Sequence, residues 1–203
     1  MTLYWHTING NKNRYKLRLR FYDNRPESPV YFEIKRRVND AILKQRASVR
    51  RDAVLWILTG HFPDPGQMLS RDPKHLVAVQ HFVQLMNENA AKPKAHIAYL
   101  REAWVSSYSN AVRVTMDREV RCDPEPTARL EKNMRDPVLV FGDRVVLELK
   151  FTGRFPDWFR EMVQVLGVAQ ASAAKYVDGV ALAGEHRFAD PSTSAPPRAV
   201  CQR

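Results

Sequence analysis

Basic residues alternate with apolar ones between Arg14 and Tyr22, where the chain reads RYKLRLRFY. Arginine binds phosphate oxygens through paired hydrogen bonds, and lysine binds them as a point charge. Side chains of a β-strand point alternately to its two faces, so Arg18 and Arg20 would lie on one charged face and the apolar residues on the other. Such a face often meets only solvent, so this run alone does not establish a binding site.

A second run of the same kind extends from Val30 to Arg37, after a polar loop that contains two prolines. Glu33 and Lys35 fall on one face of this predicted strand, and apolar residues fall on the other. If the two runs pair as a hairpin, the charged residues of both share one surface, with a carboxylate among positive charges.

The same alternation recurs from Val112 to Arg118, which includes Arg113, and again from Val146 to Lys150. In the last run Glu148 and Lys150 repeat the spacing of Glu33 and Lys35. Several such strands indicate a sheet folded so that its charged faces meet. A cavity of this kind would attract a polyanion, and its carboxylates could hold a divalent metal ion against phosphates.

Helices are predicted around these strands from capping residues and apolar spacing. The segment 52–59 is predicted to be a core helix that ends at Gly60, and Asp72-Pro73 begins an amphipathic helix of about 17 residues. A third helix is predicted from Pro156 to Val165. The segment 40–49 could be either a strand or a short amphipathic helix.

The charge balance points to an anionic partner. The chain has 203 residues, a formal net charge of +10 and a pI near 9.9, which favours phosphate chains, nucleic acid or a membrane surface. The most apolar run, 53–58, is far shorter than the roughly 20 residues of a membrane-spanning helix. With no secretion signal at the start, and with Cys122 and Cys201 interpreted as reduced thiols, we expect a cytoplasmic protein.

Several common catalytic patterns are absent from the sequence. It contains no glycine-rich phosphate loop, no CxxC zinc pattern, and no spacing that indicates a Ser-His-Asp or Cys-His set. This argues against Walker-type kinases and zinc-binding modules.

Five segments follow one another between about Gly10 and about Gly179: KLRLRFY, VYFEIKRR, VRVTMDREVR, VVLELKF and Ala174-Lys175-Tyr176. In this order and spacing they resemble the VTC (vacuolar transporter chaperone) domain, the polyphosphate polymerase branch of the CYTH-like triphosphate tunnel metalloenzymes. The resemblance implies an α+β fold, an antiparallel β-barrel that forms a tunnel, with peripheral helices. It also implies a first strand, a helical stretch and a second strand ahead of Arg14, so we expect a domain that is incomplete at its N-terminus.

The expected domain organisation follows from this resemblance. Residues 1–13 would be a remnant of an N-terminal loop, residues 14–188 the tunnel domain without its first strands, and residues 189–203 a disordered tail rich in Pro, Ser and Ala.

The resemblance implies transfer of the terminal phosphate of ATP onto a polyphosphate chain, with Mn or Mg as the metal. Phosphoryl transfer depends mostly on positioning and charge neutralisation, so no side-chain nucleophile is required. Glu148, Lys150, Arg18 and Arg20 would be the catalytic residues, and Glu148 and Glu33 the metal ligands, with Glu33 alternatively orienting the cations. The predicted phosphate-binding residues are Arg18, Arg20, Lys35, Arg113, Lys150 and Lys175. Further candidates are Lys44, Arg46, Arg101 and Arg118.

Three alternatives stay open at this point. The domain could be an inorganic triphosphatase or a polyphosphate-binding protein of the same superfamily, or an inactive truncated copy. It could also be a basic single-stranded nucleic-acid-binding module, in which aromatic residues stack on bases. Nucleic acid is the less favoured partner, because most aromatics of the first two strands fall on the face opposite the arginines. The aromatics of the two strands are Tyr15, Phe21, Tyr22, Tyr31 and Phe32, of which Tyr22 shares the face of Arg20 and Tyr31 shares the face of Glu33.

Overall fold

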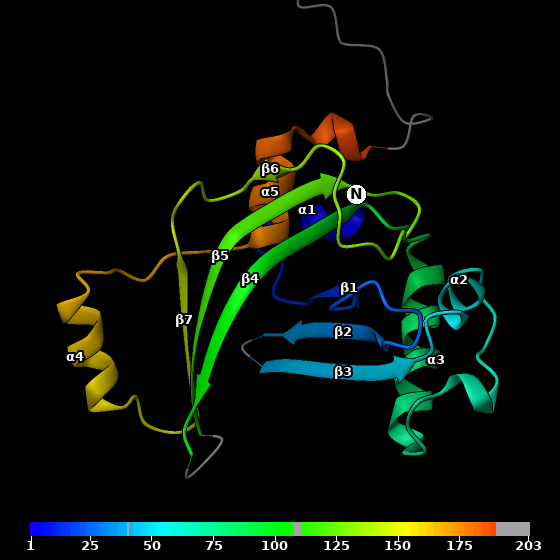
Figure 1. Cartoon of the computed structure of the whole chain (residues 1–203), viewed down its shortest axis with the longest axis horizontal. Coiled ribbons are helices and arrows are strands. Elements are labelled where there is room, and N and C mark those ends of the chain that lie inside the picture. The colour runs from blue at the N-terminus through cyan, green and yellow to red at the C-terminus, as the bar shows by residue number, and fades with distance from the viewer. Residues whose placement is uncertain (40, 108–110, 190–203) are drawn as a thin grey trace, which may run out of the picture. The chain divides into compact units, whose positions relative to one another are not determined.

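The computed structural model describes residues 1–39, 41–107 and 111–189, and these form two compact units (Figure 1). Unit 1 comprises Met1–Lys94 and Glu125–Met134, and it also includes Phe188 and Ala189. Unit 2 comprises Ala95–Pro124 and Arg135–Arg187. Each unit contains one antiparallel sheet and is described by itself.

The sheet of unit 1 has three antiparallel strands in the order β1 (Arg14–Arg20), β2 (Val30–Val38) and β3 (Ala41–Val49). Strand β2 is central, and its Val30, Phe32 and Ile34 are buried. They pack in one core with side chains of α2 (Ala53–Leu58) and α3 (Pro73–Glu88), and α3 lies against β2 and β3. The predicted hairpin is therefore confirmed, and residues 41–49 take the strand alternative.

The two helices begin where their sequence predicts. Asp72 caps α3, because its carboxylate accepts a hydrogen bond from the Lys74 amide at 2.9 Å, and Pro73 occupies the first helical position. The 3-10 turn η1 (Pro65–Gln67) lies between α2 and α3.

The beginning of the chain differs from the prediction of a loop remnant over residues 1–13. Helix α1 (Thr2–Ile8) forms there, and its Tyr4 is buried at 1% exposure. The helix contacts β1. Burial of the tyrosine ring explains a helix in a segment too short to be stable by itself.

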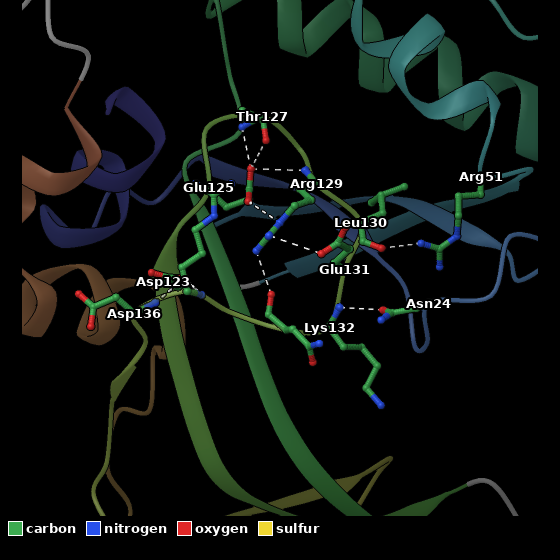
Figure 2. Close-up of polar contacts among 12 residues, drawn as sticks. Asn24, Arg51, Asp123, Glu125, Thr127, Arg129, Leu130, Glu131, Lys132 and Asp136 are labelled. Atoms are coloured by element: carbon green, nitrogen blue, oxygen red, sulfur yellow. Dashed lines mark hydrogen bonds and ion pairs between the residues drawn. The ribbon is translucent and has the colours of Figure 1, made fainter.

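The segment 125–134 belongs to unit 1, although residues 95–124, which precede it in the chain, belong to unit 2. Figure 2 shows its polar contacts. Arg51 donates to the carbonyl oxygens of Leu130 at 2.6 Å and Asp23 at 2.5 Å. The Lys132 amide donates to Asn24 Oδ1 at 2.8 Å. Leu130 also packs against the core of unit 1. These contacts tie the segment to the β1–β2 turn and to the start of α2.

The sheet of unit 2 is built around β5 (Val112–Pro124). Strand β4 (Ala95–Val105) pairs with it in antiparallel fashion, and β6 (Val138–Leu139) and β7 (Val146–Phe151) also pair with it. The remaining elements are α4 (Asp157–Val165), α5 (Lys175–Ala183) and the 3-10 turn η2 (Glu185–Phe188). The predicted third helix corresponds to α4, with Pro156 as its N-cap residue. Helix α5 packs on β5.

The α+β class and the antiparallel pairing are confirmed, and they are compatible with the predicted tunnel. The predicted tail falls almost entirely on residues 190–203, outside the described residues. Within the part of the chain that the structure describes, no helix is long and apolar enough to cross a membrane.

Candidate functional site

The first charged surface is the face of the β1–β3 sheet opposite the core of unit 1, and we call it the Glu33 surface. Glu33 lies at its centre and is only 2% exposed. The strand register places Arg18 of β1 and Arg46 of β3 directly beside it. Because β2 alternates, the residues on either side of Glu33 point into the core while its carboxylate points the other way.

Four cations surround this carboxylate. Arg18 Nε donates to Oε2 at 2.8 Å, and Arg18 Nη2 donates to the same oxygen. Arg20 Nε is 3.7 Å from Oε2, while Lys44 Nζ and Arg46 Nε are 3.3 Å and 3.5 Å from Oε1. One negative charge therefore faces four positive charges, which leaves an excess of positive charge for an anionic ligand.

The environment keeps Glu33 ionised. Burial raises the pKa of its carboxyl, but the charges and hydrogen bonds of Arg18, with the charges of Arg20 and Lys44, outweigh burial and hold the pKa below its usual range. The side chains of Arg18 and Lys44 remain 49% and 52% exposed, so the cations that Glu33 orients stay accessible. Lys35 extends the same surface, because it is exposed and lies between Lys16 and Lys44.

Two tyrosines lie at the other end of the Glu33 surface. The Arg46 guanidinium lies over the Tyr31 ring, 3.6 Å from its centroid. Tyr22 meets Tyr31 edge to face at 6.0 Å, and Arg20 Nη1 donates to the Tyr22 hydroxyl at 3.5 Å. The predicted burial is correct for Phe32 in the core, and for Tyr15 and Phe21 packed against it, and Tyr22 and Tyr31 lie with the charges as their alternation predicts.

The second charged surface lies in unit 2, and we call it the Asp117 surface. Asp117 of β5 is 0% exposed. Arg101 of β4 donates to both its oxygens, at 2.5 Å and 2.7 Å, and Lys175 Nζ is 2.9 Å from Oδ2. Burial raises the pKa of Asp117, but its bonds with Arg101 and Lys175 lower the pKa by more, and Asp117 in turn raises the pKa of Arg101. A buried, ionised aspartate thus holds two cations in fixed positions.

Glu148 and Lys150 of β7 adjoin this pair. Glu148 Oε2 accepts a hydrogen bond from Thr115 at 3.4 Å and is 3.7 Å from Arg101 Nη2. Lys150 Nζ is 3.3 Å from Glu148 Oε1. The side chains of Glu148 and Lys150 are 40% and 53% exposed, so both can reach a ligand.

The remaining predicted residues divide between the two surfaces. Arg113 is exposed and lies opposite Lys150 in the strand register. Lys175 is the first residue of α5, and its Nζ lies 5.5 Å from the centroid of the Tyr99 ring. The guanidinium carbon of Arg101 lies 5.1 Å from the same centroid. Arg118 instead pairs with Glu102 at 3.0 Å. The structure thus brings Arg18, Arg20, Glu33 and Lys35 together in unit 1, and Arg113, Glu148, Lys150 and Lys175 together in unit 2.

Sequence reasoning did not assign a role to Asp117 and underrated Lys44, Arg46 and Arg101. In the sequence, Asp117 alternates in step with Arg113 and Thr115, which indicates that the three share one strand face. That Arg101 lies beside Asp117 follows only from the pairing of β4 with β5. The register of β3 likewise decides that Arg46 meets Glu33.

The two predicted metal ligands differ in how well they suit a cation. Glu148 is partly open and carries oxygens of the kind that magnesium and manganese prefer. Glu148 also faces two cations, Lys150 and Arg101, but its side chain is 40% exposed. Glu33 is buried among four cations, and a metal ion there would add positive charge to four positive groups. Across residues 1–39, 41–107 and 111–189, no three His, Cys, Asp or Glu side chains are grouped to hold a metal by themselves. The residues therefore fit a metal held by Glu148 with ligand oxygens, and do not fit one at Glu33.

Antiparallel sheets that carry clustered, partly exposed cations define a basic α+β protein with surfaces suited to polyanions. The family model described as the VTC domain matches residues 1–183, and the chain belongs to this family, which is related to polyphosphate polymerases. The predicted resemblance is thereby confirmed. A search of curated proteins found no match.

Proposed function

We propose that this chain is a polyphosphate polymerase, a metal-dependent phosphotransferase that moves the terminal phosphate of ATP onto a polyphosphate chain. The observation that carries the proposal is the Glu33 surface, where one buried carboxylate orients four cations, of which Arg18 and Lys44 have half-exposed side chains. Membership of a family related to polyphosphate polymerases supports phosphate chains as the anion.

Each group has a defined role in this proposal. Arg18 and Arg20 bind phosphate oxygens from one strand, and Lys44 and Arg46 bind them from another, while Glu33 keeps their head groups aligned. In unit 2, Lys150, Arg113 and the cations anchored on Asp117 form a second set of groups that can bind phosphate oxygens and neutralise their charge. Charges held in place before the reaction need no reorganisation during it.

Glu148 is the residue that would hold Mn²⁺ or Mg²⁺ together with phosphate oxygens, and such an ion would neutralise negative charge on the phosphates. Thr115, Lys150 and Arg101 contact the Glu148 carboxylate and fix its orientation. Glu33 acts through the cations it orients and not through a metal.

Incubation of the full chain with ATP and Mn²⁺, followed by separation of the products on a polyphosphate gel, tests this function. We expect a ladder of phosphate chains from the wild type and none from Glu148→Ala. The matched control is Glu161→Ala, an exposed carboxylate of α4 in the same unit, which should leave the ladder unchanged.

The products distinguish the alternatives. Free phosphate without chains would replace the polymerase by a triphosphatase of the same superfamily. Binding of tripolyphosphate without turnover of ATP would indicate a polyphosphate-binding protein or an inactive copy. An unchanged ladder from Glu148→Ala would contradict the role of Glu148.

A further inference from the structure

Tyr22 and Tyr31, which we call the tyrosine pair, lie on the charged side of the unit 1 sheet. Tyr31 precedes Glu33 by two residues on β2, and the register places it opposite Arg20. Tyr22 follows Arg20 by two residues and is 59% exposed. The pair therefore marks one end of the Glu33 surface, and Lys35 marks the opposite end along β2.

Two arginines lie over the rings of the tyrosine pair. Arg46 lies over the Tyr31 ring at 3.6 Å, and Arg20 lies 5.9 Å from the Tyr22 ring centroid. Burial raises the pKa of the Tyr22 hydroxyl, but the hydrogen bond and charge of Arg20, with the charge of Arg46, lower it by more. One end of a phosphate-binding surface thus carries two aromatic rings and a guanidinium plane close together.

This combination suits one class of ligand. Nucleobases stack on aromatic rings and on guanidinium planes, whatever the identity of the base. A chain of phosphates alone has no group that stacks on an aromatic ring, so the pair would add nothing to recognition of polyphosphate.

We propose that the tyrosine pair and Arg46 form a stacking platform for the base of a nucleoside triphosphate. The triphosphate then extends past Arg20 and Arg18, which lie about 7 Å apart along β1, and its terminal phosphate points toward Lys35. This inference rests on the proposed function, because it assigns the base subsite and the direction of the phosphate donor, ATP.

The test compares two ligands that share the triphosphate and differ in the nucleoside. Isothermal titration calorimetry of the full chain measures the affinities for ATP and for inorganic tripolyphosphate, with Tyr22→Ala as the variant. We expect Tyr22→Ala to weaken ATP binding about tenfold, because loss of one stacking ring commonly costs this much, and to leave tripolyphosphate binding unchanged. The conservative variant Tyr22→Phe keeps the ring, and it should recover the ATP affinity that Tyr22→Ala loses.

Each result decides between the two proposals. Equal weakening of both ligands by Tyr22→Ala would overturn the platform, because the ring would then act only by positioning Arg20. Unchanged ATP affinity in Tyr22→Ala would also overturn it. If the wild type binds neither ligand, the proposed function fails and the base subsite fails with it, whereas retained tripolyphosphate binding separates loss of the platform from loss of that function.

Discussion

Glu33 shows how a single buried residue organises a charged surface. Its carboxylate is buried between two cations of β1 and two of β3. Without its negative charge, these four groups would repel one another at close range. The residue should therefore contribute both to stability and to the placement of phosphate-binding groups.

Replacement of Glu33 by glutamine should lower the free energy of unfolding at pH 7 by about 2 kcal/mol, because a buried partner of several charge-assisted hydrogen bonds is lost. The folded-state pKa of Glu33 lies below its unfolded value of about 4.3. Its contribution is therefore complete above that value and is lost as the pH falls through the folded pKa. Urea denaturation at pH 7 and near pH 3 should show a large difference between Glu33→Gln and wild type at pH 7 and a small one near pH 3.

The control for this measurement is Glu27→Gln, because the Glu27 side chain is 71% exposed and lies 3.8 Å from the exposed Arg25. It should match the wild type at both pH values. An equal loss for the two variants, or a difference for Glu33→Gln that persists undiminished in acid, would contradict the role assigned to Glu33.

The sequence predicted the residue-scale picture only in part. The period of two placed Arg18, Arg20, Glu33 and Lys35 on one face correctly, because parity depends on local spacing alone. The convergence of Lys44 and Arg46 on Glu33 depends on which residues of β2 and β3 are paired. That register is set by packing and turn geometry across the sheet, which a strand's own sequence does not contain.

At the scale of elements, α5 is the helix whose packing is most constrained. A Cβ atom at Gly179 would lie 2.6 Å from Cys122 Cβ and 2.8 Å from its Sγ, so the helix backbone approaches β5 more closely than any other residue would allow. This close approach fixes α5, and with it Lys175 at the start of the helix.

Gly179→Ala should therefore destabilise the protein, although alanine has the higher helix propensity. Overpacking of this kind costs about 1–3 kcal/mol, which lowers the melting temperature by several degrees. The matched control is Gly66→Ala, where an added Cβ meets nothing within 4 Å. Thermal denaturation that finds the two variants equally stable would contradict the close packing of α5.

The elements that sequence reasoning missed are short helices. Helix α1 and helix α5 lack the long apolar periodicity of α3, and α5 contains a glycine in its interior. Both are held by tertiary contacts, through buried Tyr4 in one and buried Gly179 in the other. Helices α3 and α4 were predictable because a proline stands at the start of each.

At the scale of the whole molecule, the net charge of +10 favours association with anions. Long-range attraction between exposed charges is screened by salt. Part of the positive charge is fixed on the two surfaces, and the Glu33 surface provides it without a metal ion. Composition alone predicted an anionic partner. Only the fold shows that cations from separate strands lie together on one surface.

Tripolyphosphate should bind in the presence of EDTA, and its affinity should fall roughly tenfold between about 0.1 and 1 M NaCl as screening increases. Single-stranded oligonucleotides of equal charge should bind more weakly, because their charges are spread along a longer backbone. Titration calorimetry with both ligands measures this. Tighter binding of the oligonucleotide, independent of manganese, would favour the nucleic-acid-binding alternative.

The division into two units could not be predicted from the sequence, because it also depends on contacts between residues far apart in the chain. The segment 125–134 belongs with residues 1–94, although strands β4 and β5 lie between them in the chain. Its attachment depends on the hydrogen bonds from Arg51 to Leu130 and from Lys132 to Asn24, which join residues 79 and 108 positions apart. No local sequence pattern predicts contacts between residues so far apart.

Because Cys122 is packed beneath α5, the rate at which its thiol reacts can report on the movement of that helix. The thiol is fully buried, and burial raises its pKa to about 12, so the reactive thiolate is scarce at neutral pH. Alkylating reagents can reach it only when α5 separates from β5. With Cys201 replaced by serine, the rate of labelling would therefore measure how often the helix that carries Lys175 opens, and how far a bound polyanion slows that opening.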